Sequence, residues 1–360
     1  MKERVPHPIP VGRLVINEIE ARGWTQADFA VVLGRPVQFV SEIVNGKKEI
    51  TRESAAQIGA ALGPSPEFWL SFQDQFLLSE QAKDLAKQRE LSDVRRRAQL
   101  NDLVPVAILR KRGVLMGSSL EELEAEIVDL LELESIDRRP KFDFAARRSN
   151  VNEPLSPGQY AWVACIKRQA RSRQASLGRY AEQQFRELAA TLPKLLDGPT
   201  AFASLPGLFA AVGVALVYVE ALPGAKIDGC AFLLGDIPVI GLSGRGKRLD
   251  KILWTLLHEA AHVVLGHVSA KILVEKLDDD EISPDGIETA ADHQANGWLL
   301  PAPLPSPPVR ITAGWLNGIA KERGLAPVVI IGQLQKRGAL DWRSNFARNA
   351  PNVSGVLAAW

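Results

Sequence analysis

Three of the five histidines of this 360-residue chain lie within residues 255–267, in the stretch "TLLHEAAHVVLGH". His258 and His262 are four residues apart, so on a helix both imidazoles project from one face and can bind one metal ion. Glu259 lies beside them, where its carboxylate can act on a water molecule rather than serve as a ligand. The spacing H-E-x-x-H therefore predicts two Zn²⁺ ligands, His258 and His262, and a general base, Glu259. The alternative interpretation is an apolar helix that carries buried histidines and no metal.

A catalytic zinc site of this type needs a third protein ligand, and the downstream segment "DGIETAADHQANGWLLP" supplies one. Glu288 and Asp292 are four residues apart on an expected helix, so both can face the same way. Glu288 can complete a His-His-Glu site and leave a fourth position for water. Asp292 can accept a hydrogen bond from the second nitrogen of a ligand histidine. His293 is a candidate to polarise a substrate carbonyl and so stabilise the transition state.

The remaining polar residues near the motif are weaker candidates for metal ligands. Glu281 and Asp285 are the alternative third ligands. His267 follows the motif, and we expect it to point away from the ligands and to have a structural role. Cys165 and Cys230 are far apart and match no paired-ligand spacing, so we expect both in the core.

The elements that would position the site are strands followed by a long helix. After residue 205 the runs "VGVALVYVE", "CAFLLGD" and "IPVIGLS" are rich in β-forming residues and separated by turns, which predicts strands. Residues 79–204 are predicted to be mostly helical, and two further helical segments are expected near residues 310–337. Residues 138–187 carry eleven Lys and Arg against four Asp and Glu. This basic stretch is either a solvated helical face or a surface for an acidic partner.

Residues 1–78 are predicted to form short helices joined by tight turns that contain glycine, as in a helix-turn-helix domain. The second helix of that motif is expected to begin near Arg35 and Pro36 and to bury Val37, Val40 and Ile43. The side chains expected at base edges are those of Arg35, Gln38 and Ser41. Those expected at phosphates are Gln26, Asn45, Lys47 and Lys48.

The charge balance limits the kinds of partner. The whole chain has 43 basic and 42 acidic residues, which argues against a protein that coats nucleic acid along its whole length but leaves a local DNA-binding module open. Residues 1–78 carry eight Lys and Arg against nine Asp and Glu. Non-specific affinity for DNA should therefore be weak, and binding to operator DNA as a homodimer is expected. The alternative is a helical domain that docks a protein such as a toxin.

Composition also indicates the compartment. No apolar run approaches the roughly 20 residues that cross a bilayer, so no membrane partner is expected. The low cysteine content and the absence of a signal-like start favour a reducing, cytoplasmic setting.

Two segments resemble known families. The segments "HEAAHVVLGH" and "ETAADHQANGWLLP", with the strand region before them, resemble the ImmA/IrrE family of zinc metallopeptidases over residues 205–305. This chain has Ala290 where the family commonly has a second glutamate. The segment from "TQADFAVVLG" through "EIVNGKKEIT" to "SPEFWL" resembles HigA-like antitoxins of the Xre-type helix-turn-helix class. Fusion of the two modules is an architecture to which the whole chain is similar.

The expected fold is mainly α with a small α+β domain. We expect a lambda-repressor-like helix-turn-helix bundle at 1–78, a helical intermediate region at 79–204, a zincin-like metallopeptidase domain at 205–305 and a helical extension at 306–360. The resemblance implies a transcriptional regulator that cleaves a repressor or antitoxin protein in a stress or toxin-antitoxin response. The alternative is a non-proteolytic antitoxin-type repressor whose zincin domain senses a ligand or binds a cognate toxin.

Overall fold

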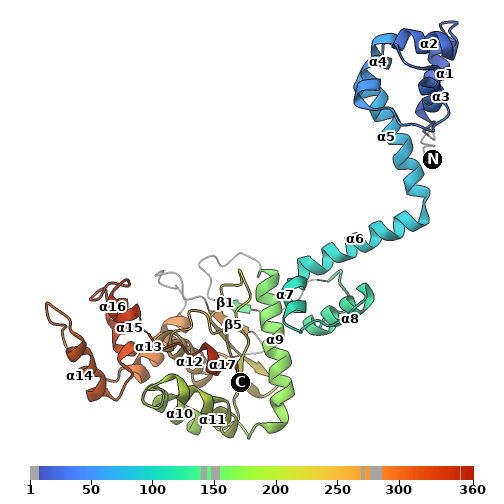
Figure 1. Cartoon of the computed structure of the whole chain (residues 1–360). Coiled ribbons are helices and arrows are strands. Elements are labelled where there is room, and N and C mark those ends of the chain that lie inside the picture. The colour runs from blue at the N-terminus through green and yellow to red at the C-terminus, as the bar shows by residue number, and fades with distance from the viewer. Residues whose placement is uncertain (1–7, 139–143, 147–154, 269–271, 276–285, 349) are drawn as a thin grey trace. The chain divides into compact units, whose positions relative to one another are not determined.

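The chain forms two compact units, which divide between Arg96 and Arg97. The computed structural model describes residues 8–138, 144–146, 155–268, 272–275, 286–348 and 350–360. Figure 1 labels the α-helices of both units and strands β1 and β5.

The described part of the first unit contains helices α1 to α5 in full, and three of these begin at a hydroxyl side chain. Thr25 and Thr51 each close a capping box with the residue three positions on, and Ser65 accepts a hydrogen bond from the N–H of Phe68. Such caps satisfy the N–H groups that the first helical turn leaves without a partner. The helices are α1 (Val11–Glu20), α2 (Gln26–Leu33), α3 (Val37–Val44), α4 (Arg52–Leu62) and α5 (Pro66–Lys83).

Helix α3 lies close to α1 because Gly12 of α1 has no side chain. A Cβ atom at Gly12 would overlap the backbone of Ile43 and Val44 at the end of α3. The predicted core residues Val40 and Ile43 are buried, but Val37 is 49% exposed. The prediction for Val37 is wrong because this residue opens α3 directly after the exposed Pro36, at the edge of the core.

The second unit combines helices with one five-stranded sheet. Helix α6 (Leu85–Leu103) runs across the division, and its last turn buries Leu100 and Leu103 in the second unit. The other α-helices are α7 (Val106–Lys111), α8 (Leu120–Leu131), α9 (Pro157–Arg173), α10 (Glu182–Leu195), α11 (Leu205–Ala211), α12 (Leu249–Val264), α13 (Gly286–Leu299), α14 (Ala313–Arg323), α15 (Pro327–Lys336), α16 (Asn345–Arg348) and α17 (Ser354–Leu357). Two short 3-10 helices are η1 (Gln174–Ser176) and η2 (Pro199–Ser204).

The sheet has the strand order β1-β5-β3-β4-β2. Its strands are β1 (Phe144–Ala146), β2 (Ala215–Tyr218), β3 (Gly229–Leu234), β4 (Ile237–Leu242) and β5 (Ile272–Glu275). Strand β3 is antiparallel to both of its neighbours, whereas β2 is parallel to β4 and β1 is parallel to β5. The three strands predicted from β-rich runs are confirmed as β2, β3 and β4.

Alternate residues of the strands face two different helical layers, as the pleat requires. On one face, Leu216 and Ala231 belong to a core shared with α10, α12, α13 and α15. On the other face, Val217 and Cys230 belong to a core shared with α8 and α9. Figure 1 shows α9 and α12 on opposite sides of the sheet. Cys165 of α9 and Cys230 are buried free thiols in the second core, as expected of core residues.

The expected division at residues 79, 205 and 306 differs from the two units of the structure. Helix α9 lies in the expected intermediate region, yet it packs against one face of the sheet. Helix α15 lies in the expected extension, yet it packs against α12. The broader expectation of a mainly helical chain with a small sheet is confirmed. Among the described residues, no helix is both long and apolar enough to cross a bilayer.

Candidate metal centre and helix-turn-helix surface

Helices α12 and α13 bring three potential metal ligands to one buried point. His258 and His262 lie on α12 with 0% and 1% exposure, and Glu288 in the first turn of α13 is 6% exposed. The Nε2 atoms of the two histidines are 2.9 Å apart. Oε2 of Glu288 lies 3.2 Å from Nε2 of His258 and 3.6 Å from Nε2 of His262.

This donor set fits a zinc ion. The three ligand atoms lie within 4.8 Å of one another, and two imidazole nitrogens with one carboxylate oxygen are the ligands of many catalytic zinc sites. Polar groups this deeply buried and this close are costly unless charge or hydrogen bonds compensate them. A cation held among them would supply that compensation.

Without a metal, Nε2 of His258 and Nε2 of His262 face the Glu288 carboxylate and donate to it, so these protons have to leave Nε2 when a metal binds. Burial opposes ionisation of Glu288, but hydrogen bonds from His258 and His262 and their charge outweigh it and hold the pKa of Glu288 well below its usual range. Burial lowers the pKa of His262, against the opposing effect of the Glu288 carboxylate. A neutral imidazole and an ionised carboxylate are the forms that bind a metal.

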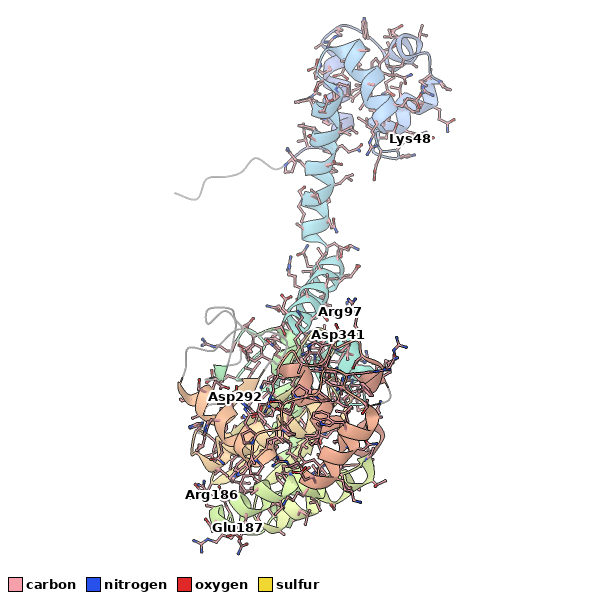
Figure 2. All side chains as sticks on the ribbon, turned by 90° about the vertical axis from the view of Figure 1, so that its left-hand side faces the viewer. Lys48, Arg97, Arg186, Glu187, Asp292 and Asp341 are labelled. Atoms are coloured by element: carbon pink, nitrogen blue, oxygen red, sulfur yellow. The ribbon has the colours of Figure 1, made fainter. Side chains whose placement is uncertain are left out.

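Asp292 lies one turn after Glu288 on α13 and contacts the outer nitrogen of His258. Its Oδ1 atom is 2.9 Å from Nδ1 of His258. Figure 2 marks Asp292 in the second unit, where its side chain is 29% exposed. A carboxylate in this position fixes the tautomer in which Nε2 of His258 has a free lone pair for a metal.

Glu259 is buried at 1% exposure next to strand β3. A Cβ atom at Gly229, the first residue of β3, would lie 2.7 Å from Oε1 of Glu259 and 2.7 Å from Cγ2 of Thr255. Gly229 therefore provides the space that the Glu259 carboxylate occupies. Gly229 is a functional residue that was not predicted, although a glycine within a strand is itself a sign of close approach.

His267 is the functional candidate that the sequence analysis placed outside the site. Its Nδ1 atom lies 3.2 Å from Nδ1 of His262, on the side of that ring away from Glu288. His293, by contrast, is exposed on α13. The alternative ligands Glu281 and Asp285 lie outside the described residues.

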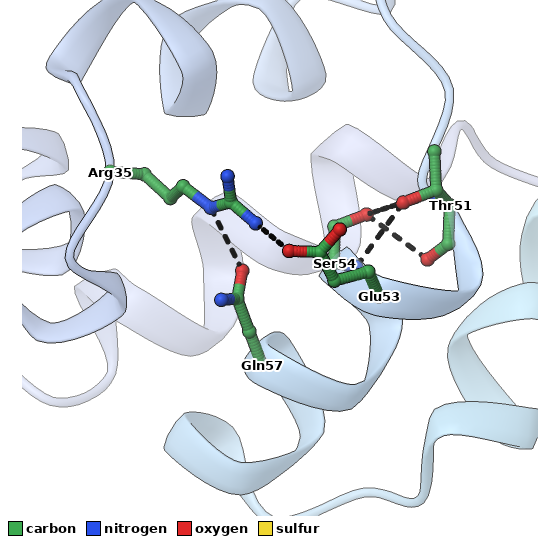
Figure 3. Close-up of polar contacts among 5 residues, drawn as sticks. All are labelled: Arg35, Thr51, Glu53, Ser54 and Gln57. Atoms are coloured by element: carbon green, nitrogen blue, oxygen red, sulfur yellow. Dashed lines mark hydrogen bonds and ion pairs between the residues drawn. The ribbon is translucent and has the colours of Figure 1, made fainter.

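In the first unit, the half-buried Arg35 contacts two residues of α4 (Figure 3). Its guanidinium pairs with Glu53, and its Nε donates to Oε1 of Gln57 at 3.1 Å. The same guanidinium lies over the ring of Phe39. A contact of Arg35 with a base edge stays a prediction, and it would require the side chain to leave these partners.

Helix α3 and the turn after it carry most of the other expected DNA contacts. Gln38 is exposed and donates to Glu42 at 3.0 Å. Ser41 is half-buried, and its carbonyl accepts a hydrogen bond from the Asn45 side chain at 2.8 Å. Lys48 is marked in Figure 2, and its Nζ atom lies 3.7 Å from Oε2 of Glu42.

The other two expected DNA contacts also remain accessible: Lys47 is exposed, and Gln26 is half-buried at the start of α2.

Comparison with known proteins identifies the first unit. The helix-turn-helix family HTH_3 matches residues 17–70, which span α2, α3 and the turn between them. Antitoxin HigA-1 of Vibrio cholerae is 34% identical over 74 residues, which are 20% of this chain and 70% of that protein. The chain therefore belongs to the helix-turn-helix family through this part of its sequence.

Two further proteins and one solved structure are also similar to this chain. Virulence-associated protein A′ of Dichelobacter nodosus is 33% identical over 82 residues, 22% of this chain and 69% of that protein. The HTH-type transcriptional regulator YddM of Escherichia coli is 28% identical over 87 residues, 24% of this chain and 92% of that protein. A solved addiction module antidote protein of the HigA family from Coxiella burnetii is 29% identical, covering 23% of this chain and 92% of that one with a TM-score of 0.22.

Proposed function

We propose that this protein is a DNA-binding transcriptional regulator that carries a zinc-dependent endopeptidase in its second unit. The observation that carries the enzymatic part is the convergence of His258, His262 and Glu288 at a buried point beside Glu259. The DNA-binding part is supported by the helix-turn-helix match and by the accessible face of α3.

Each residue of the centre has a distinct task in peptide hydrolysis. Zinc held by the three ligands would supply Lewis acidity, polarising a peptide carbonyl and lowering the pKa of water. Glu259 is not a metal ligand. It acts as the general base that takes a proton from the attacking water and passes it to the leaving amine. Asp292 keeps His258 oriented through its contact with Nδ1.

The proposed substrate is a repressor or antitoxin protein. Two observations support this class: similar proteins bear the names antitoxin and transcriptional regulator, and the same chain carries a helix-turn-helix domain. Cleavage of such a protein would relieve repression or release a toxin during stress. Binding as a homodimer to paired operator half-sites follows the usual geometry of this domain.

A second candidate function is a non-proteolytic antitoxin-type repressor, in which the second unit senses a ligand or binds a toxin. The similarity to Antitoxin HigA-1 favours it.

The first test is the zinc content of the purified full chain, compared with that of Glu288→Ala and Glu259→Gln. We expect about one zinc per chain in the wild type and in Glu259→Gln, and none in Glu288→Ala. Glu322→Ala is the matched control, because this glutamate lies on α14 with a side chain 64% exposed. If the wild-type chain contains no zinc even after zinc has been supplied, the proposed zinc peptidase is excluded.

The second test separates the two candidate functions. New protein N-termini are compared between cells that express the wild type and cells that express Glu259→Gln. Peptides that appear only with the wild type identify the substrate. If zinc is bound but the two sets of N-termini are identical, the second unit is a sensor or toxin-binding module.

A further inference from the structure

The outer nitrogens of the two candidate ligand histidines have different partners. Asp292 contacts Nδ1 of His258 at 2.9 Å, and His267 contacts Nδ1 of His262 at 3.2 Å. Each ligand histidine is therefore contacted at the nitrogen that faces away from the metal site, His258 by a carboxylate and His262 by an imidazole. We propose that His267 is a positioning residue that fixes the tautomer and ring orientation of His262 for zinc binding; this inference rests on the proposed zinc site.

The end of α12 explains how His267 reaches this position. Gly266 adopts a φ of +68°, and its N–H donates to the carbonyl of Val263 at 3.1 Å. The N–H of His267 donates to the carbonyl of His262 at 2.9 Å. These two bonds form a Schellman motif, which folds the chain back over the last helical turn. The residue after the glycine is thereby placed beside the third residue from the end of the helix, and here both are histidines.

The hydrogen-bond direction follows from the side of His262 that faces the ligands. Its Nε2 atom lies 2.9 Å from Nε2 of His258, on the side of Glu288, so a metal would take the lone pair of Nε2. In neutral imidazole the proton is then on Nδ1, which donates to Nδ1 of His267. His267 accepts at Nδ1 and keeps its own proton on Nε2. This assignment is derived from the contacts, since each ring can exist as either tautomer.

An imidazole partner also limits the charge of the site. Glu288, Asp292 and Glu259 already place three carboxylates around the two histidines. His267 orients His262 without adding a fourth carboxylate to the site.

The test measures zinc affinity of the full chain by competition with a chromogenic chelator. His267→Ala and His267→Leu remove the acceptor, and we expect affinity to fall about tenfold to a hundredfold. His267→Asn offers an amide oxygen near the position of Nδ1, and we expect it to retain affinity within about threefold of the wild type. Glu322→Ala is the control, because this exposed glutamate lies on α14 and has no part in the site, and its affinity should equal that of the wild type.

Two further readouts separate positioning from a general loss of structure. Thermal unfolding of the metal-free variants should match the metal-free wild type, and the visible absorption of bound Co²⁺ should change in His267→Leu but not in His267→Asn. If His267→Ala does not fold, the comparison of His267→Leu with His267→Asn decides. Wild-type affinity in His267→Leu, or equal losses in the Asn and Leu variants, overturns the role of His267 while the zinc site stands. A wild type that binds no zinc overturns both.

Discussion

The candidate metal centre is built from side chains whose charge states depend on one another. Glu288 is ionised despite its burial because two histidines donate to it, and His262 is neutral because it is buried. Folding therefore favours an ionised Glu288 and a neutral His262, which are the charge states that a metal requires, and a metal would displace the proton from Nε2. In the metal-free chain this selection makes stability depend on pH.

The free energy of unfolding of the metal-free chain should fall as the pH drops below about 6.5. The pKa values of His262 and His267 are lowered from 6.5 in the folded chain, mainly by burial. The unfolded chain then binds more protons, so acid favours unfolding. The lowered pKa of Glu288 has no effect in this window, because its contribution is lost only in stronger acid. Urea unfolding between pH 8 and pH 5.5 measures how far the free energy of unfolding falls. The fall should be smaller in His262→Gln, and an equal fall in this variant and in the wild type would contradict the explanation.

Arg35 and Gln38 should affect DNA binding differently. Gln38 is accessible on α3, so Gln38→Ala should weaken operator binding by about 1–3 kcal/mol and relax base preference at one position. Arg35 is engaged by Glu53 and Gln57, so Arg35→Ala should reduce stability of the first unit by about 1 kcal/mol or less. Selection of bound genomic fragments with each variant tests the base preference. A loss of base preference in Arg35→Ala would mean that this side chain leaves α4 to contact DNA.

At the scale of elements, the packing of α12 against β3 depends on one glycine. In Gly229→Ala the new methyl group would overlap Glu259 and Thr255, so we expect a loss of about 1–3 kcal/mol in stability and displacement of the Glu259 carboxylate. Gly297→Ala on α13 is the control, since no atom lies within 4 Å of its added Cβ and alanine favours a helix. Thermal unfolding of both variants, with zinc content, distinguishes local overlap from a general effect of the substitution.

Sequence periodicity predicted the elements that are defined locally. The four-residue spacings of His258 with His262 and of Glu288 with Asp292 fitted two ligand-bearing helices, and β-rich runs separated by turn residues predicted three strands. Strands β1 and β5 were not predicted, because their pairing joins segments more than a hundred residues apart and leaves little local pattern. The contacts of Arg35 with α4 and the position of His267 were also missed. Each depends on a partner that only the folded chain brings within reach.

At the scale of the whole molecule, each unit has a core of its own. The core of the first unit is built from residues between Val11 and Trp69, and that of the second contains both candidate metal helices. Damage to one unit should therefore leave the intrinsic chemistry of the other intact. The expected functions can be separated by mutation.

Gly12→Ala should weaken DNA binding and preserve zinc content, and Glu288→Ala should do the reverse. The first substitution forces α1 away from α3, whereas the second removes a ligand on α13. Fluorescence anisotropy with a selected DNA fragment and elemental analysis of the same preparations measure both properties. Loss of both in either variant would show that the two units depend on each other for folding.

The two buried cysteines give the second unit internal reporters of its opening. Burial raises the pKa of Cys165 to about 11 and that of Cys230 well above its usual value, so neither thiol ionises readily in the folded chain. Because the thiolate is the reactive form, alkylation has to await separation of α9 from the sheet. Cys230 follows Gly229, the residue that packs against Glu259, so its labelling rate reports on the strand beside the metal centre. Zinc that stabilises the folded unit would slow this labelling, which gives a measure of binding that requires neither a substrate nor an operator.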